Sequence, residues 1–164
     1  MEGKNGVEAL YTLVDSIRAE FENNPFVKSV TLGTLTEVDL MKMTIFPMAH
    51  IILNQVVHND YNLAFDITIV NLDIVNISKD EAIQLGDDGY YGNDNIMYIW
   101  TNQLYVINRL VAKLKQGRYA GIVIQLDGMP VSEAIKYEYE NMLAGYQTTL
   151  TISLPNDIDK CYEV

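Results

Sequence analysis

Two stretches of the chain repeat apolar residues at the three- and four-residue spacings that place side chains on one face of a helix. The first covers residues 7–22 and stops before Pro25, because proline cannot continue a helix. Most charged residues of this stretch fall on the opposite face. We therefore predict an amphipathic helix with one buried seam. The seam consists of Leu10, Val14, Ile17 and Phe21, broadened by Leu13.

The second helical stretch covers residues 96–116 and is the more regular of the two. Asp94 or Asn95 can cap its first turn, and Gly117 follows its last turn, where glycine often ends a helix. Because the seam spans only two heptads, it indicates packing against a core rather than a coiled coil. The seam consists of Trp100, Leu104, Ile107, Val111 and Leu114, broadened by Ile96, Met97, Ile99, Val106 and Leu110.

Two β-rich runs lie between the predicted helices, at residues 45–57 and 61–77. They are separated by His58-Asn59-Asp60, and Asn and Asp suit a turn because their short side chains bond locally. In the second run the odd positions from Tyr61 to Ile69 are apolar, while even positions include Asp66 and Thr68. The two runs therefore predict an antiparallel hairpin.

Weaker β patterns occur on either side of these elements, and residues 37–44 are polar enough to be a connection. Asp127-Gly128 is typical of a turn, whereas residues 131–145 fit a strand or a helix equally well. The weaker patterns predict further strands at residues 27–35, 119–126 and 146–154.

This order of elements favours an α+β fold, because the strands neither alternate regularly with helices nor form an unbroken series. We expect a mainly antiparallel sheet with a long β-hairpin and two helices packed on one face, in a single domain over residues 1–164. Residues 78–95 hold three glycines, many acids and two tyrosines. They predict a long, exposed acidic loop, which in a compact domain is functional or mobile.

Acidic residues outnumber basic ones: 22 Asp and Glu face 11 Lys and Arg, for a formal net charge of −11. Such a surface opposes nucleic-acid binding, which depends largely on cations that neutralise phosphates. Two interpretations remain, namely acidity for solubility alone or a surface along which DNA passes without sticking. No apolar stretch is long enough for a membrane helix and no secretion signal begins the chain, so we expect it to stay where it is made.

No nucleotide-binding, hydrolase or metalloprotease motif occurs, and one cysteine with two histidines cannot assemble a thiolate–imidazole zinc site. His50 lies in a predicted strand and is expected to be a hydrogen-bonded sheet histidine rather than a base or ligand. Glu133, Glu138 and Glu140 are better explained as a solvated face than as catalytic carboxylates. We therefore predict no catalytic, cofactor-binding or metal residues and no enzyme activity, with a motif-poor hydrolase as the opposing hypothesis.

A small acidic ligand- or metal-binding module is the alternative function. Asp87-Asp88-Gly89 through Asp94 resembles a calcium loop in composition, because hard cations prefer several oxygen ligands on a tight turn. The loop lacks the EF-hand spacing and its closing bidentate glutamate.

Subunit contacts are the remaining candidate function. A long hairpin in a small domain offers sheet edges, and sheet extension across subunits covers such edges. Copies joined head to tail through their edges close into a ring. The candidate subunit-interface residues are Tyr61 and Phe65 in the hairpin, with Tyr90 and Tyr91 in the acidic loop.

Three segments carry a resemblance to a known family: FPMAHIILNQVVHNDYNLAFDITIVNLDIV from Phe46, YIWTNQLYVINRLVAKLKQG from Tyr98 and YENMLAGYQTTLTISLPN from Tyr139. They resemble virion neck and tail-joining proteins of tailed phages that infect Bacteroidetes, including crAss-like and marine phages. The Asn102–Leu110 pattern and the LAGY segment are the most distinctive parts. The order of elements is similar to that of tail terminator proteins.

The resemblance implies a structural virion protein that forms a homo-oligomeric ring at the head–tail interface, assembled in the host cytoplasm and located in the neck or tail. Its partners would be copies of itself and other neck, portal or tail proteins. The acidic ring lining would let genome DNA slide through without specific binding, and the hairpin and the 78–95 loop would contact neighbouring subunits.

Overall fold

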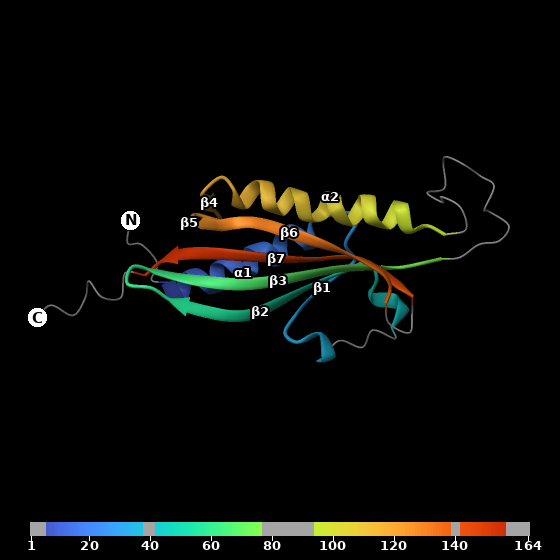
Figure 1. Cartoon of the computed structure of the whole chain (residues 1–164), viewed down its shortest axis with the longest axis horizontal. Coiled ribbons are helices and arrows are strands. Elements are labelled where there is room, and N and C mark those ends of the chain that lie inside the picture. Colours follow the sequence, from blue (N-terminus) through green and yellow to red (C-terminus); the bar gives the residue numbers. More distant parts are fainter. Residues whose placement is uncertain (1–5, 38–41, 77–93, 139–141, 157–164) are drawn as a thin grey trace, which may run out of the picture.

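The computed structural model describes residues 6–37, 42–76, 94–138 and 142–156. These residues form an α+β fold with a five-stranded, mostly antiparallel sheet and two α-helices, as the sequence predicts (Figure 1). The elements follow in the order α1 (Gly6–Glu22), β1 (Ser29–Leu32), η1 (Leu35–Glu37), η2 (Met43–Ile45), β2 (Met48–His58), β3 (Asn62–Ile74), α2 (Ile96–Leu114), β4 (Arg118–Tyr119), β5 (Ile122–Val123), β6 (Gln125–Glu138) and β7 (Leu143–Pro155).

The five strands lie side by side in the order β1-β2-β3-β7-β6, and β4 and β5 form a separate small hairpin. Strand β1 runs parallel to β2, and every other neighbouring pair in the large sheet is antiparallel. The predicted hairpin is confirmed: β2 and β3 pair from Met48 with Leu72 to His58 with Leu63. The predicted first strand is shorter than expected, because β1 pairs with β2 over four residues only.

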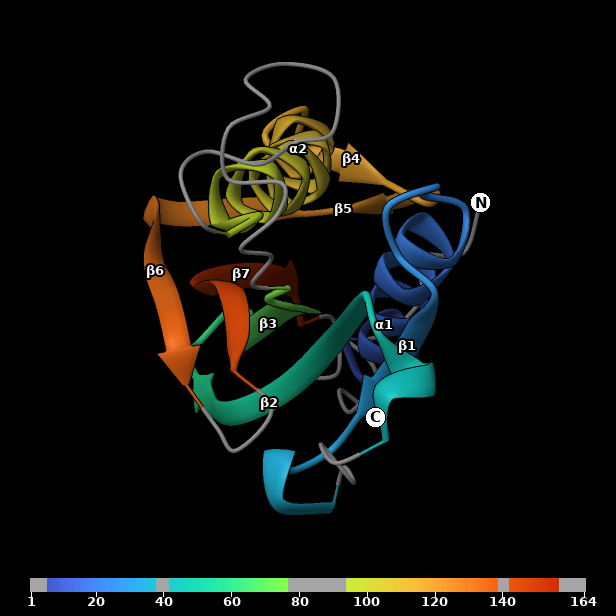
Figure 2. The same cartoon turned by 90° about the vertical axis from the view of Figure 1, so that its right-hand side faces the viewer.

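Both helices cover the same face of the curved sheet (Figure 2). The odd-numbered positions of β3 from Leu63 to Ile69 point into this helix-covered side and are buried, because side chains alternate along a strand. They join the α1 residues Leu13, Ile17 and Phe21, none of which is exposed, in one core. Burying each large apolar side chain contributes about 2 kcal/mol, which makes this layer the main source of stability.

Polar contacts fix the two helices against each other. The Glu20 carboxylate of α1 forms ion pairs with Arg109, at 2.7 Å, and with Lys113 of α2. The Tyr119 hydroxyl donates a hydrogen bond to the Ser16 carbonyl at 2.9 Å, and burial, followed by the nearby Glu20 charge, raises the pKa of Tyr119 to about 12. These contacts join α1, α2 and β4 on the helix side.

The buried face of α2 differs from the predicted seam. Leu104 is 46% exposed and Trp100 is only half-buried, so the centre of the face lies elsewhere. The predicted seam missed Gln103, which is 1% exposed and lies in the middle of the buried face. A prediction from apolar spacing alone cannot include a polar residue. The buried residues of α2 are Ile96, Ile99, Gln103, Val106, Ile107, Leu110 and Leu114.

The C-terminal third of the sheet also departs from the sequence prediction. Asp127-Gly128 is not a turn between elements but lies inside β6, at an irregularity where the register shifts between Asp127 and Val131. The ambiguous residues 131–138 and 143–145 belong to strands β6 and β7, because β6 pairs with β7 along most of its length. The intrinsic strand propensity of these residues does not predict this pairing with a distant segment of the chain.

Candidate functional site

The sheet face opposite the helices, here called the open face, carries a group of polar side chains from four strands. Asp66 of β3, Thr151 of β7 and Asp127 of β6 lie in one row across three strands. The next row toward the β2–β3 turn holds Ser153 and Gln125. We call the residues of these two rows, together with Gln55 opposite Asp66, the polar patch.

Hydrogen bonds link the members of the polar patch in two groups. The Thr151 hydroxyl donates to one oxygen of Asp66 at 2.8 Å, and the Gln55 amide donates to the other. The Gln125 amide donates to Asp127 at 2.9 Å, and the Ser153 hydroxyl donates to the second Asp127 oxygen. The hydrogen bond from Gln55, and then that from Thr151, lower the pKa of Asp66, because both favour the charged carboxylate.

Basic residues are separated from this face. Strands β2, β3 and β7 contain no Lys or Arg, and β6 contains one, Lys136. Lys136 follows Ile135, whose side chain packs in the apolar cluster on the open face, so alternation along the strand turns Lys136 away. Three cations of the helices form ion pairs within the helix layer, Arg18 with Glu22, and Arg109 and Lys113 with Glu20.

The other half of the open face is covered. Ile45 of η2 and Phe46 close over Met48, Val70 and Leu72 to form an apolar cluster with Ile135 and Leu143. His50, which is not exposed, lies on this face with its Nδ1 2.6 Å from the Thr31 hydroxyl. The prediction of a hydrogen-bonded sheet histidine is therefore confirmed.

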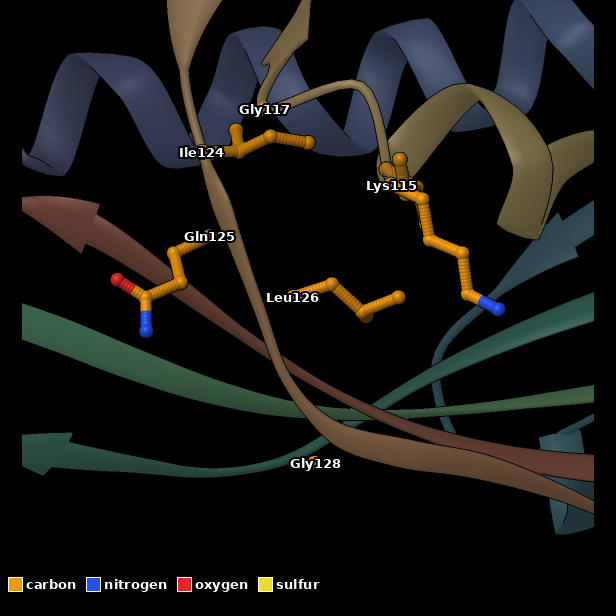
Figure 3. Close-up of a pocket in the computed structure, with 7 residues that line it drawn as sticks. Lys115, Gly117, Ile124, Gln125, Leu126 and Gly128 are labelled. Atoms are coloured by element: carbon orange, nitrogen blue, oxygen red, sulfur yellow. The ribbon is translucent and has the colours of Figure 1, made fainter.

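The pocket between α2 and β6 brings together no acidic, histidine or cysteine side chain among the described residues. This open pocket of about 250 Å³ lies between the end of α2 and β6, lined by Lys115, Gln125, Leu126 and glycines 117 and 128 among others. Its Lys115 amine and Gln125 amide lie on opposite sides of the Leu126 side chain (Figure 3). Across the described ranges, no three His, Cys, Asp or Glu residues gather as a metal site.

The candidate residues of the sequence prediction separate into three groups. Tyr61, in the β2–β3 turn, is 80% exposed and is available for contacts. Phe65 is wrong as a contact residue, because it is 2% exposed on the helix side of β3 and belongs to the core. Tyr90 and Tyr91, and the acidic segment from Asp87 to Asn93, lie outside the described residues. Of the three glutamates expected on a solvated face, Glu133 is exposed, Glu138 is the last residue of β6, and Glu140 lies outside the described residues.

The two outer edges of the sheet differ, a feature that sequence patterns do not reveal. On β6, Met129 is 92% exposed at the register shift, Pro130 has no N–H to offer, and the Trp100 indole N–H bonds the Ile135 carbonyl at 3.1 Å. On the opposite edge, β1 ends at Leu32 while β2 continues to His58, with no strand beside this half of β2 among the described residues.

A half-buried carboxylate outside the polar patch gives a test of the fold. Burial raises the pKa of Asp73, although the Ile74 N–H donates to it at 2.8 Å. A raised folded-state pKa means that folding loses stability as pH rises from the unfolded pKa of about 3.9 through the folded pKa. We expect Asp73→Asn to raise the unfolding midpoint at pH 7 and to have little effect at pH 3.

Thermal unfolding at both pH values, with Asp15→Asn on the exposed side of α1 as the control, checks this prediction. An equal gain at both pH values, or a loss at pH 7, would show that burial of the Asp73 charge does not weaken the fold.

No protein-family model matches the chain, and no curated protein sequence matches it. Within the described ranges, no helix is long and apolar enough to span a membrane.

Proposed function

We propose that this chain is a structural subunit of a homo-oligomeric ring at the head–tail interface of a tailed phage, with the open face of its sheet toward a passage for DNA. The observation that supports this function is the chemistry of that face. On this face the described residues of β2, β3, β6 and β7 supply the Asp66 and Asp127 carboxylates, hydroxyls and amides, and no Lys or Arg.

Electrostatics explain how such a face would serve a passage. DNA binds to proteins mainly where Lys and Arg neutralise phosphates and release counterions. Carboxylates and neutral hydrogen-bonding groups offer no such sites, so a duplex is repelled and slides. The ion pairs of Glu20 and Glu22 hold Arg18, Arg109 and Lys113 in the helix layer, which would form the outer wall of the ring.

The resemblance to neck and tail-joining proteins supports the same function. Its three segments correspond to the β2–β3 hairpin, α2 and β7, which build the centre of the fold. The proposed partners are therefore other copies of the chain and further neck, portal or tail proteins in the virion, after assembly in the host cytoplasm. The function requires assembly and no turnover of a substrate.

Oligomeric state tests this proposal directly. Light scattering after size-exclusion chromatography is expected to give a mass that is a multiple of 18.6 kDa, and negative-stain images are expected to show closed rings with a central hole. A chain that remains monomeric at high concentration and does not join isolated phage necks or tails would overturn the proposal.

Reversal of charge on the open face tests the role of the carboxylates. Glu133 also lies on the open face, because it pairs with Gln147, which pairs with Val70 of the apolar cluster there. We expect the triple variant Asp66→Lys, Asp127→Lys and Glu133→Lys to retain double-stranded DNA at about 100 mM salt and to release it as salt rises, because cations create phosphate contacts. The wild-type chain is expected to show no retention. Filter binding or mobility shift measures both.

The matched control introduces three lysines on the helix side instead, through Glu8→Lys, Asp15→Lys and Glu22→Lys. It has the same net charge as the open-face variant. In assembled rings, this control should retain DNA on the outer wall only, so its rings should remain open when imaged with DNA. Equal DNA density inside both variant rings would contradict a lumen lined by the open face.

A further inference from the structure

Irregularities on the two outer edges of the sheet lie at the same level along the strands. Leu53 of β2 pairs with Ile67 of β3, which pairs with Leu150 of β7. On β6, Asp127 pairs with Thr151 and Val131 with Thr149, so residues 128–130 form a bulge beside Leu150. The register of β2 also shifts between Leu53 and Gln55. The bulge on the β6 edge is therefore level with Leu53 on the opposite edge, where β2 continues beyond the end of β1.

At this level one edge of the sheet carries a bulge and the other edge has a stretch of β2 that is unpaired on that side among the described residues. The bulge, residues 128–130, presents Met129 with 92% of its surface exposed. On the opposite edge β1 stops at Leu32, opposite Ile51, and leaves the space beside β2 from Leu53 onward free of any described strand. We call this space the notch. An open pocket of about 220 Å³ adjoins it, lined by Val14, Arg18, Val30, Thr31, Leu32 and Ile51.

Strand directions allow one copy to present its bulge to the notch of the next. Because β2 and β7 each run antiparallel to β3, and β6 runs antiparallel to β7, strand β6 runs opposite to β2 and β1. A rotation about an axis parallel to the strands preserves these directions and keeps the helices on the same side. Such a rotation brings β6 of one copy antiparallel to β1 and β2 of its neighbour, the arrangement in which strands pair most readily.

The chemistry of both edges favours a contact between copies of an acidic chain. Residues 53–58 of β2 and 128–132 of β6 contain no Asp, Glu, Lys or Arg, so copies with a net charge of −11 meet here without opposing like charges. Leu32, Leu53 and Val57 are 60%, 40% and 45% exposed around the notch, and Val131 is 61% exposed beside the bulge. A flexible methionine suits such an irregular apolar space.

We propose that the β6 bulge at Met129 inserts into the notch of a second copy, between the end of β1 and the free edge of β2, as the repeating contact of the assembly. This inference rests on the proposed ring and specifies which surfaces build it. The contact is heterologous, since bulge and notch are different surfaces, and its repetition closes a ring when the rotation between copies is a whole fraction of a full turn. Pro130 limits strand pairing at the bulge, so side-chain insertion replaces part of the ladder there.

Charge placed on either side of the contact tests the inference. Met129→Asp on the bulge and Leu53→Asp in the notch are each expected to raise the concentration needed for half-assembly of the full chain by more than about tenfold, because each buries an unpaired carboxylate. The matched control is Met97→Asp on the outer side of α2, where Met97 is 49% exposed and outside the contact. Its assembly is expected to equal that of the wild-type chain.

Mixing the two variants tests whether the contact is heterologous. A Met129→Asp copy keeps a normal notch and a Leu53→Asp copy keeps a normal bulge, so an equimolar mixture is expected to form heterodimers and no rings in light scattering. Absence of any complex in the mixture would overturn the pairing of these two surfaces. Circular dichroism checks the fold of each variant, and Met129→Ser and Leu53→Ser replace any variant that fails to fold.

The outcomes separate this inference from the proposed function. If the wild-type chain forms rings and both aspartate variants form them equally well, the bulge and notch are not the contact, and the ring proposal stands. If the control Met97→Asp loses assembly while the two variants keep it, the contact lies on α2 instead. If the wild-type chain stays monomeric, both proposals fail.

Discussion

Replacement of Gly145 by alanine is expected to abolish the native fold or to lower its free energy of unfolding by more than about 4 kcal/mol, a large part of the stability of a typical domain. A Cβ at this position would lie 1.8 Å from the Asn71 carbonyl oxygen and 2.8 Å from its carbonyl carbon. Both atoms belong to the backbone of β3, the central strand of the sheet, so no side-chain rotation relieves the overlap. Strand β3 or β7 would have to move.

Gly121 provides the matched control for this prediction. It lies in the β4–β5 turn with φ +82°, and a Cβ there has no heavy atom within 4 Å. Gly121→Ala is therefore expected to cost only the strain of a left-handed alanine, about 1–2 kcal/mol. Urea unfolding followed by circular dichroism measures both variants. Similar losses for Gly121→Ala and Gly145→Ala would show that strands β3 and β7 are not as close as described.

The second large effect is expected at Phe65. Truncation to alanine in Phe65→Ala should lower the free energy of unfolding by about 3–5 kcal/mol, because it leaves a cavity among packed side chains. Phe65 is 2% exposed and lies in the core formed by α1, α2 and the sheet. The loss should appear in the isolated chain, whether or not it assembles.

Tyr61→Ala is the control from the same strand region. Tyr61 is 80% exposed in the β2–β3 turn, so its truncation is expected to change the stability of the isolated chain by no more than about 0.5 kcal/mol. Chemical denaturation at a concentration below assembly distinguishes the two residues. A small effect at Phe65, or a large one at Tyr61, would contradict the side-chain alternation of β3.

Local patterns were sufficient where one face of an element is buried against a single surface. The β2–β3 hairpin follows from the alternation around Phe65 and Ile67 and from the Asn-Asp turn, and α1 follows from its regular seam. The same patterns failed at Gln103, whose polar side chain lies in the centre of the buried face of α2. They also failed at Asp127-Gly128, where typical turn residues form a bulge within a strand.

The candidate site shows the same division. Sequence reasoning predicted an acidic, motif-free chain and chose Tyr61 as a contact residue, and this residue is exposed. It also chose Phe65, because the sequence pattern does not show which face of the hairpin the helices cover. The polar patch was missed, since Asp66 and Asp127 are 61 positions apart and meet in one row only through β7.

The sequence by itself determined the α+β class, the central hairpin, both helices and a net charge that opposes DNA binding, because each depends on spacing or composition within a short stretch. Tertiary structure alone decided which sheet face stays uncovered, which strands form the edges, and that bulge and notch lie at one level. These features depend on pairing between residues far apart in the chain. Long-range register therefore decides where this protein can contact a second copy.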